Sequence, residues 1–199
     1  MTQEMRTAEL TRRTGETDIR LRLCLDGTGS GNIDTGIGFF DHMLQGFARH
    51  GLFDLDVKVD GDLHIDGHHT VEDTGIVLGQ AFAKALGDKA GIRRYGSACV
   101  PMDEVLVLAA VDLSGRPYLA FDGFEFASER VGGFDSELTL EFFRAFSTHA
   151  AMNLHLRCLA GGNTHHLIEA TFKACARALD QATQFDARVR GIPSTKGSL

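Results

Sequence analysis

His68-His69-Thr70-Val71-Glu72 recurs later in the chain as His165-His166-Leu167-Ile168-Glu169, and each copy opens a helical pattern. Residues four apart lie on one face of a helix, so the first histidine and the glutamate of each copy form a pair that can chelate one metal ion. The second histidine of each doublet is turned by roughly 100° around the helix and can serve another ion. The two copies therefore predict two metals.

The surrounding sequence repeats in the same order. The doublets are displaced by 97 residues, from 68 to 165, whereas the segments before them are displaced by 99, so that Phe47–His50 aligns with Phe146–His149 and Asp54–Val57 with Asn153–Leu156. The difference of two residues falls in a loop, where length changes easily. We therefore predict an internally duplicated α+β fold, in which a strand, helix, strand, loop and helix recur and the helices cover one face of an antiparallel or mixed sheet.

Periodicity and turn residues locate the main elements. Alternation of apolar and polar residues, or a continuous apolar run of strand length, predicts strands, and helical spacing followed by glycine predicts helices with a C-cap. The expected elements are a strand over Ile19–Leu25, a helix over Phe39–His50 capped by Gly51, a strand over Leu52–Val59, a helix from His68 to about Leu86 closed by Gly87, and a strand over Val105–Leu113.

Composition limits the functional classes. The 199 residues, 43% hydrophobic and 24% charged, suit one domain or two small halves packed together. The net charge of −7 argues against binding to nucleic acid or to a membrane surface, and no apolar run is long enough to span a bilayer. Four cysteines without C-x-x-C spacing predict reduced thiols and a cytoplasmic protein, namely Cys24, Cys99, Cys158 and Cys175.

The duplication also predicts how ligands are shared. In its register His42 falls opposite Glu141, and both side chains can bind metal. We expect one ion to be held by His42, His69, His165 and Glu169, and the other by His68, Glu72, Glu141 and His166. Imidazole and carboxylate ligands without thiolate suit manganese, iron or zinc. Spacing does not decide whether the two halves of a site meet within one chain or across chains.

With these residues identified, the chain resembles imidazoleglycerol-phosphate dehydratases over nearly its whole length. The segments that carry the resemblance are Leu25–Gly29, Phe40–Leu44, Asp66–Asp73, Asp112–Leu119, Asn163–Ala174 and Pro193–Gly197. The resemblance implies a two-layer sandwich with two four-stranded sheets, each with two helices on one face, like domain 2 of ribosomal protein S5. It implies a single domain over 1–199 with repeats at about 10–93 and 94–190 and a substrate-binding tail at 191–199. Some members of the family carry histidine at the position of Glu141.

The same resemblance implies a hydro-lyase of histidine biosynthesis, which converts D-erythro-imidazole-glycerol phosphate to imidazole-acetol phosphate. It implies two Mn²⁺ ions per site at subunit interfaces of a 24-subunit shell, with iron or zinc as substitutes. The expected mechanism holds the ring as a di-metal-bound imidazolate, which expels the hydroxyl to give a diazafulvene-like intermediate. Glu16 matches the family's candidate acid/base, with Glu72 and Glu169 nearby.

Substrate contacts follow from the resemblance as well. Beyond Glu16, the candidates are His42, His50, His68, His69, Arg94, Arg116, Lys173, Ser194 and Lys196, of which the cationic and hydroxyl side chains suit a phosphate. On sequence alone, Arg116 is more often the tip of a turn, and Ser194 and Lys196 more often belong to a frayed terminus. For Lys173, a helix salt pair with Glu169 is an equally good explanation.

Two other functions are compatible with twin metal-binding motifs. One is a different di-metal enzyme, such as a hydrolase or a carboxylate-bridged oxidase, although the latter places Glu-x-x-His on bundle helices and this chain is rich in predicted strands. The other is a metal-storage shell, which needs ligands but no phosphate clamp. Arg94, Arg116 and Lys196 argue against storage.

Overall fold

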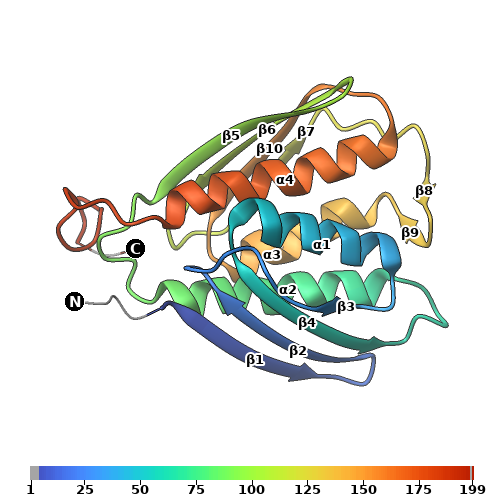
Figure 1. Cartoon of the computed structure of the whole chain (residues 1–199), viewed down its shortest axis with the longest axis horizontal. Helices are drawn as coiled ribbons and strands as arrows, with labels where there is room; N and C mark the ends of the chain where they lie inside the picture. Colours follow the sequence, from blue (N-terminus) through green and yellow to red (C-terminus); the bar gives the residue numbers. More distant parts are fainter. Residues whose placement is uncertain (1–4, 198) are drawn as a thin grey trace.

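Each half of the chain folds into two hairpin strands, a third strand, a helix, a fourth strand and a second helix (Figure 1). The computed structural model describes residues 5–197 and 199. The first half consists of β1 (Thr7–Arg13), β2 (Thr17–Cys24), β3 (Ile33–Asp34), α1 (Gly38–Gly51), β4 (Asp54–Gly61) and α2 (His68–Leu86). The second consists of β5 (Tyr95–Met102), β6 (Val105–Asp112), β7 (Tyr118–Asp122), α3 (Leu138–His149), β10 (Asn153–Ala160) and α4 (Thr164–Thr183), with a small hairpin, β8 (Arg130–Val131) and β9 (Phe134–Asp135), before α3.

The two sheets have the same topology. Their strand orders are β1-β2-β4-β3 and β5-β6-β10-β7. In each, the first three strands pair antiparallel and the last pair is parallel, with Leu21 opposite Val57 in the first sheet and Ala109 opposite Leu156 in the second. Strand β10 begins 99 residues after β4, as the sequence register requires. The prediction of an internally duplicated α+β fold is confirmed.

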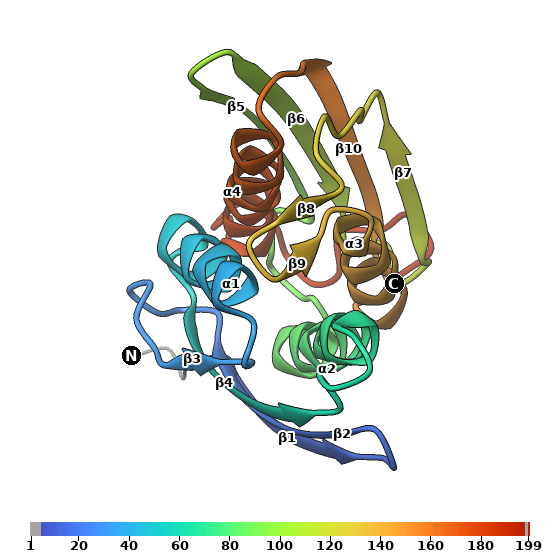
Figure 2. The ribbon, with the colours of Figure 1, turned by 90° about the vertical axis from the view of Figure 1, so that its right-hand side faces the viewer.

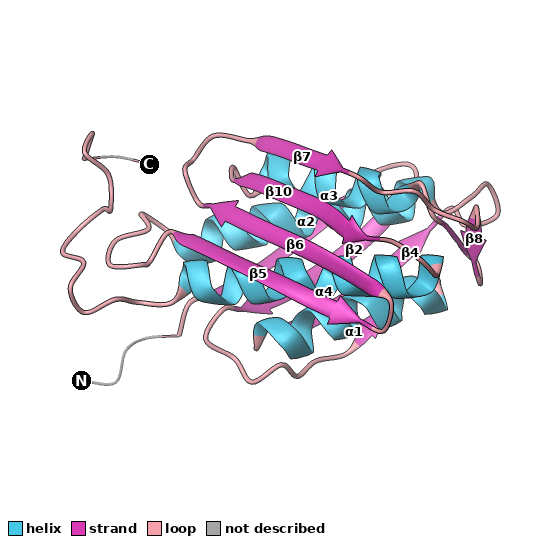
Figure 3. Ribbon diagram, turned by 90° about the horizontal axis from the view of Figure 1, so that it is seen from above, coloured by secondary structure: helices cyan, strands magenta, loops and turns pink. Residues whose placement is uncertain are grey.

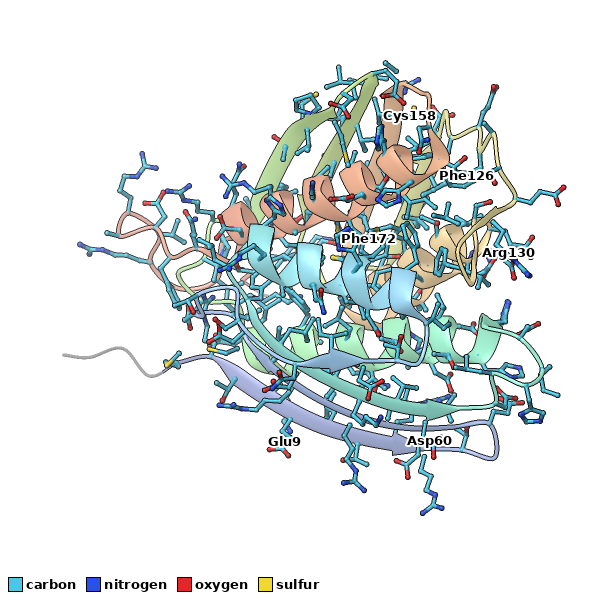
Figure 4. All side chains as sticks on the ribbon, turned by 45° about the vertical axis from the view of Figure 1, so that its right-hand side comes forward. Glu9, Asp60, Phe126, Arg130, Cys158 and Phe172 are labelled. Carbon is cyan, nitrogen blue, oxygen red and sulfur yellow. The ribbon has the colours of Figure 1, made fainter. Side chains whose placement is uncertain are left out.

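Alternation along each central strand decides which sheet face is buried. In β2, Ile19, Leu21 and Leu23 are fully buried, while Arg20 and Arg22 point to the other face. The outer face of this sheet is charged, and Figure 4 shows Glu9 and Asp60 extending away from the molecule. A half-buried sheet of this kind requires cover on its apolar face only. That cover comes from the helices.

The helices of both halves lie between the two sheets (Figure 2). Viewed from above, the strands β5, β6, β10 and β7 lie side by side over the helices (Figure 3). Helix α1 packs against α4, and α2 packs against α3, so every helix contacts one from the other repeat. Phenylalanine rings fill the centre, including Phe142 and Phe172 with centroids 5.0 Å apart. The duplicated halves therefore share one core.

Two glycines allow α2 to approach α3 closely. A Cβ atom on Gly75 would lie 2.7 Å from the carbonyl oxygen of Phe142, and one on Gly79 would lie 2.7 Å from that of Phe146. These separations are shorter than any ordinary carbon–oxygen contact. The backbone of α3 therefore occupies the space that side chains at these two positions would need.

The structure corrects the predicted end of the first helix. Gly51 is the last helical residue rather than the cap, and Leu52 takes the left-handed conformation with φ of 58°. Its backbone N–H bonds to the carbonyl of Ala48, which closes the helix. Gly51 is required for a different reason, because the ring of Phe53 occupies the place of its side chain.

All four helices begin at one end of the molecule and finish at the other (Figures 1 and 2). The His-His segments open α2 and α4, so both lie at the same end. The C-terminal segment after α4 lies at the opposite end, near the end of α2 (Figure 1). Among the described residues, no helix has the length and apolar character needed to cross a membrane.

Candidate metal-binding and substrate-binding site

Three of the predicted metal ligands form a cluster within one chain. His42 lies in the second turn of α1, and His165 and Glu169 lie one turn apart on α4, which packs against α1. Atom Oε2 of Glu169 lies 3.1 Å from Nε2 of His165 and 3.5 Å from Nε2 of His42. One ligand atom from each residue falls within 4.8 Å of the others. This donor set of two imidazoles and one carboxylate suits a divalent transition metal.

Glu169 is held as a carboxylate by its surroundings. Its residue surface is only 8% exposed, and Lys173 Nζ lies 2.7 Å from its Oε1. Burial alone would raise the pKa of Glu169, but the hydrogen bond and charge of Lys173, with His42 and His165, outweigh burial and lower it. The ionised form needed for metal binding is therefore the stable one.

The second predicted ligand set does not assemble within one chain. His68 and Glu72 form the expected pair on α2, with Nε2 and Oε2 3.8 Å apart. Glu141 on α3 instead accepts hydrogen bonds from Arg144 at 2.7 and 2.6 Å. Among the described residues, no metal-sized cluster joins His68 or Glu72 to Glu141. The copy on α2 is thus an incomplete site.

His69 faces carboxylates rather than His42 and His165. Its Nδ1 lies 2.9 Å from Asp62, which follows β4, and its Nε2 lies 3.7 Å from Glu16 in the β1–β2 turn. The hydrogen bond to Asp62, assisted by the charge of Glu16, raises the pKa of His69. Glu16, the candidate acid/base, therefore lies beside a candidate metal ligand.

His166 has a matching environment in the second half. Its Nδ1 lies 3.1 Å from Glu104 and its Nε2 3.7 Å from Asp103, both in the β5–β6 turn. The backbone N–H of Asn163, with that of Glu104 itself and with His166, lowers the pKa of Glu104 to about 2. The sequence motifs did not predict Asp62, Asp103 or Glu104. The available signal was position, since Asp62 directly follows a strand and Asp103 and Glu104 lie in the turn between two strands.

A groove between α1 and α4 brings further candidates together. This hollow of about 370 Å³ is lined by Lys173 and by both His42 and His50 of α1, as well as by Glu169. Burial, together with the positive charges of Lys173 and Arg177, lowers the pKa of His50. His50 is therefore a neutral imidazole near pH 7. The groove places metal-competent and substrate-competent side chains on one surface.

The phosphate candidates gather at the opposite end of the molecule. An open pocket of about 670 Å³ is lined by Arg94, Arg116, Ser194 and Lys196. Arg94 is already engaged, because its Nε and Nη2 donate to Asp112 at 2.6 and 3.1 Å and its Nη1 donates to the carbonyl of Pro193 at 2.8 Å.

Within this pocket the candidates have different contacts. Arg94 ties the C-terminal segment to β6, where Asp112 ends the strand. The backbone N–H of Lys196 bonds to Ser194 Oγ. Because the residue is exposed, its ammonium is accessible to a ligand.

The two groups of candidates are far apart in one chain. The backbone N–H of Arg94 bonds to the carbonyl of Ala182 near the end of α4, whereas His165 lies in its first turn. At 1.5 Å per residue, about 25 Å of helix separates these points. A small phosphate ester cannot contact both ends of the same chain.

Comparison with known proteins gives consistent results. The sequence model of the family described as imidazoleglycerol-phosphate dehydratase matches residues 35–179. The imidazoleglycerol-phosphate dehydratase of Acetivibrio thermocellus is 62% identical over 194 residues, covering 98% of this chain and 99% of that protein. That of Gluconacetobacter diazotrophicus is 60% identical over 195 residues, covering 98% of each.

Solved structures agree with the sequence comparison. The crystal structure of imidazoleglycerol-phosphate dehydratase from Staphylococcus aureus superposes with a TM-score of 0.82 at 40% identity, covering 90% of this chain and 99% of that one. The structure of the enzyme from Pyrococcus furiosus superposes with a TM-score of 0.81 at 37% identity, covering 96% and 100%.

Proposed function

Because the chain belongs to the imidazoleglycerol-phosphate dehydratase family, a family of hydro-lyases, we propose that it dehydrates D-erythro-imidazole-glycerol phosphate to imidazole-acetol phosphate in histidine biosynthesis. The observation that best supports this proposal is the cluster of His42, His165 and Glu169, which offers metal ligands beside a groove lined by further polar side chains. The reaction removes a hydroxyl from the carbon that carries the ring and a proton from its neighbour, and the resulting enol becomes the ketone.

Metal binding is part of the proposal. His42, His165 and Glu169 would hold one ion. His69 of another subunit would be the fourth ligand, since His69 of the same chain faces Asp62 instead of this cluster. His68 and Glu72, with His166 and Glu141 as the remaining candidates, would hold the other. When bound, Mn²⁺, or iron or zinc in its place, supplies Lewis-acid activation of the imidazole ring.

Proton transfer is assigned to Glu16. Its carboxylate is half exposed beside His69 and lies in a turn fixed on both sides. The backbone N–H of Glu16 donates to Thr14 Oγ1, and Thr17 donates to the buried Asp73. A carboxylate held in this way next to a ring-binding site can take the proton from the neighbour of the carbon that carries the ring, and can return a proton to the ring-bearing carbon when the enol becomes the ketone. Glu72 and Glu169 act as ligands in this scheme.

The phosphate is assigned to the C-terminal pocket. Arg116, Ser194 and Lys196 offer two cations and a hydroxyl to its oxygens. Arg94 contributes by fixing the segment that carries Ser194, because it bonds to the carbonyl of the preceding Pro193. Lys173, which is paired with Glu169, would contact the substrate from the groove side.

A site that needs both ends of the molecule requires more than one chain. The metal-binding end and the phosphate-binding end are separated by most of α4, so each active site would combine the two ends of neighbouring subunits. Assembly into a closed shell of 24 subunits satisfies this requirement for every chain at once. The cytoplasm is the proposed location, where a biosynthetic enzyme with reduced thiols functions.

A turnover assay tests the proposed function. The protein is freed of metal, reloaded with Mn²⁺ and incubated with imidazole-glycerol phosphate while ketone formation is followed. The proposal expects product from the manganese form and none from the metal-free form. A protein that assembles and binds Mn²⁺ but forms no ketone would contradict it. His165→Asn serves as the control for activity that does not depend on the site.

A further inference from the structure

The second histidine of each doublet, called here the outer histidine, is His69 in the first repeat and His166 in the second. Each ring lies between two carboxylates, although no single sequence motif encodes these partners. In both His69 and His166, Nδ1 faces one carboxylate at hydrogen-bond distance and Nε2 faces the second at 3.7 Å. The Nδ1 partners, Asp62 and Glu104, come from different places in their repeats, after β4 and before β6. The Nδ1 contact has thus been built twice from different elements, whereas the carboxylates facing Nε2, Glu16 and Asp103, come from corresponding hairpin turns.

Asp62 is positioned for His69 alone. Its backbone N–H donates to the carbonyl of Glu16, which fixes the residue beside the β1–β2 turn. Its Oδ2 lies 2.9 Å from His69 Nδ1, while its Oδ1 is buried without a hydrogen-bond partner among the described residues. Burying a carboxylate oxygen is unfavourable, so a carboxylate kept here with one partner indicates a role for that partner.

Glu104 is fixed more tightly. Its Oε1 accepts the backbone N–H of Asn163 at 2.6 Å, and its Oε2 lies 3.1 Å from His166 Nδ1. Asn163 is the N-cap of α4, and its side chain accepts the backbone N–H groups of His165 and His166. Glu104 therefore bonds to both the cap of the helix and a ring in its first turn.

We infer that Asp62 and Glu104 are positioning residues that fix the tautomer of the two outer histidines, so that each presents its Nε2 lone pair to a metal ion. An ionised carboxylate only accepts hydrogen bonds, so Nδ1 of each neutral imidazole must carry the hydrogen. The other nitrogen is then unprotonated and able to bind a cation. Carboxylates in this position orient metal-binding histidines and increase ligand basicity. The inference rests on the proposed metal-dependent function.

Glu104→Gln is the decisive variant. The N–H of Asn163 requires an oxygen at 2.6 Å, so the new carbonyl takes that side and the new amide NH₂ faces His166 Nδ1. A donor in that place forces Nδ1 to accept, which moves the hydrogen to Nε2 and blocks metal binding there. For Asp62, whose second oxygen has no partner, an amide can turn either way, and Asp62→Ala is the sharper change.

Two measurements test the inference. The first is ¹⁵N magic-angle-spinning NMR of sedimented, metal-free protein labelled at histidine, at a pH where the rings are neutral; difference spectra against His69→Gln and His166→Gln identify the two rings. We expect hydrogen on Nδ1 in the wild type and on Nε2 of His166 in Glu104→Gln. The second is Mn²⁺ titration followed by electron paramagnetic resonance. We expect a loss of about 10- to 100-fold in affinity for one ion in each variant.

Matched variants separate positioning from general damage. Asp60→Ala removes an outward-pointing carboxylate two residues from Asp62 (Figure 4), and Glu125→Gln makes the same chemical change as Glu104→Gln at an exposed position. Both should keep wild-type tautomers and affinity. Should Asp62→Ala fail to fold, Asp62→Asn replaces it, with a mixed tautomer population at His69 expected.

The outcomes distinguish this inference from the proposed function. Wild-type tautomers and Mn²⁺ affinity in Glu104→Gln and Asp62→Ala would overturn the inference and leave the proposed function standing. A wild-type protein that binds no Mn²⁺ would overturn both. Weakened affinity with the tautomers unchanged would also overturn the inference, because the two carboxylates would then act on the metal through charge alone.

Discussion

Glu72 and Glu169 occupy the same place in the two copies of one motif, yet their surroundings differ. The Glu169 side chain is 11% exposed and pairs with Lys173, whereas that of Glu72 is 43% exposed and, among the described residues, forms an ion pair with His68 alone. Helix geometry makes each histidine–glutamate pair predictable, since both members lie on one face. The added partners are not predictable from local spacing, because the packing of α1 against α4 brings His42 to Glu169.

The role of Glu16 gives a prediction at this scale. Glu16→Gln keeps the size of the side chain but removes its ability to take a proton, so we expect kcat to fall about 10²- to 10⁴-fold. Mn²⁺ content should stay at the wild-type level, because Glu16 is not among the proposed ligands. Steady-state kinetics and metal analysis of the purified protein measure both.

Glu9→Gln is the control for this substitution. Glu9 lies on β1, the strand that precedes the same turn, but points outward from the sheet (Figure 4). It should leave kcat unchanged. Full turnover by Glu16→Gln with metals bound would remove Glu16 from the mechanism.

Local spacing also could not predict the carboxylates beside His69 and His166. Glu104 lies 62 residues from His166, and no periodic pattern connects a hairpin turn to the first turn of a distant helix. Asp62 is only seven residues from His69 but belongs to an irregular loop. Spacing rules hold within a helix or strand, so ligands on a helix were predicted while their loop-borne partners were not.

At the scale of elements, central strands and helices were predicted and edge strands were not. Strand β2 alternates clearly because one face is buried, and β6 is a continuous apolar run of strand length. The predicted ranges overlap both strands closely. Strand β5 is an edge strand with alternating exposed and half-buried residues, including a glycine and a proline, so its pattern is weak. Strand β1, the other antiparallel edge, has only one fully buried residue.

Helix packing gives the next prediction. Gly79→Ala would place a methyl group 2.7 Å from the Phe146 carbonyl oxygen and 2.8 Å from the backbone nitrogen of Ala150. We expect the free energy of unfolding to fall by about 1–3 kcal/mol, since overpacking exceeds the gain in helix propensity. Urea denaturation followed by circular dichroism measures the change.

Gly46→Ala is the matched control with the opposite sign. Gly46 lies within α1, and a Cβ there would meet no atom within 4 Å. The substitution should stabilise the protein by about 0.5–1 kcal/mol through helix propensity alone. Equal stabilisation by Gly79→Ala would show that α2 and α3 are not held at this close distance.

At the scale of the whole molecule, the side chain of Arg6 links the start of the chain to the end of α4. The guanidinium of Arg6 donates to Asp26 at 2.5 Å and to the carbonyl of Thr183 at 2.7 Å, and it stacks on the Phe185 ring. Burial alone would raise the pKa of Asp26, but hydrogen bonds from the Arg6 side chain and backbone lower it. Arg6 therefore joins the two repeats, and the Asp26 carboxylate that holds its guanidinium has a charge that depends on pH.

The direction of that shift fixes a pH dependence. A carboxylate whose pKa is lower in the folded state stabilises the fold above its unfolded pKa of about 3.9, and this contribution is lost as pH falls through the folded value. Asp26→Asn should thus lower the free energy of unfolding by about 1–2 kcal/mol at pH 7. The difference from wild type should shrink as the pH falls below 4.

Thermal unfolding between pH 3 and pH 7 measures this difference, because that range spans the ordinary carboxyl pKa of about 3.9. Asp18→Asn is the control, because the ion pair of Asp18 with the exposed Arg13 is long, at 3.7 Å, and its loss should change stability little. A penalty for Asp26→Asn that stays constant down to pH 3 would show that the ion pair itself contributes nothing.

Separation of the two ends of the chain leads to a prediction about subunit sharing. His165→Asn damages only the metal-binding end and Lys196→Ala only the C-terminal pocket, and each should abolish or greatly reduce turnover alone. If each site draws one end from each of two subunits, a site in a mixed oligomer can take an intact metal-binding end from the Lys196→Ala chain and an intact pocket from the His165→Asn chain. With random one-to-one mixing, about a quarter of the sites should be fully intact.

Co-expression of the two variants with different affinity tags, followed by purification through both tags, isolates the mixed oligomer for a turnover assay. A mixture of separately purified homo-oligomers is the control and should stay inactive. Each variant lacks one of the two ends, which lie about 25 Å of helix apart, so neither variant can complete a site by itself. Activity of the co-expressed form near a quarter of the wild-type value would therefore establish sharing. Activity no higher than that of the control would contradict a site shared between the two ends of neighbouring subunits.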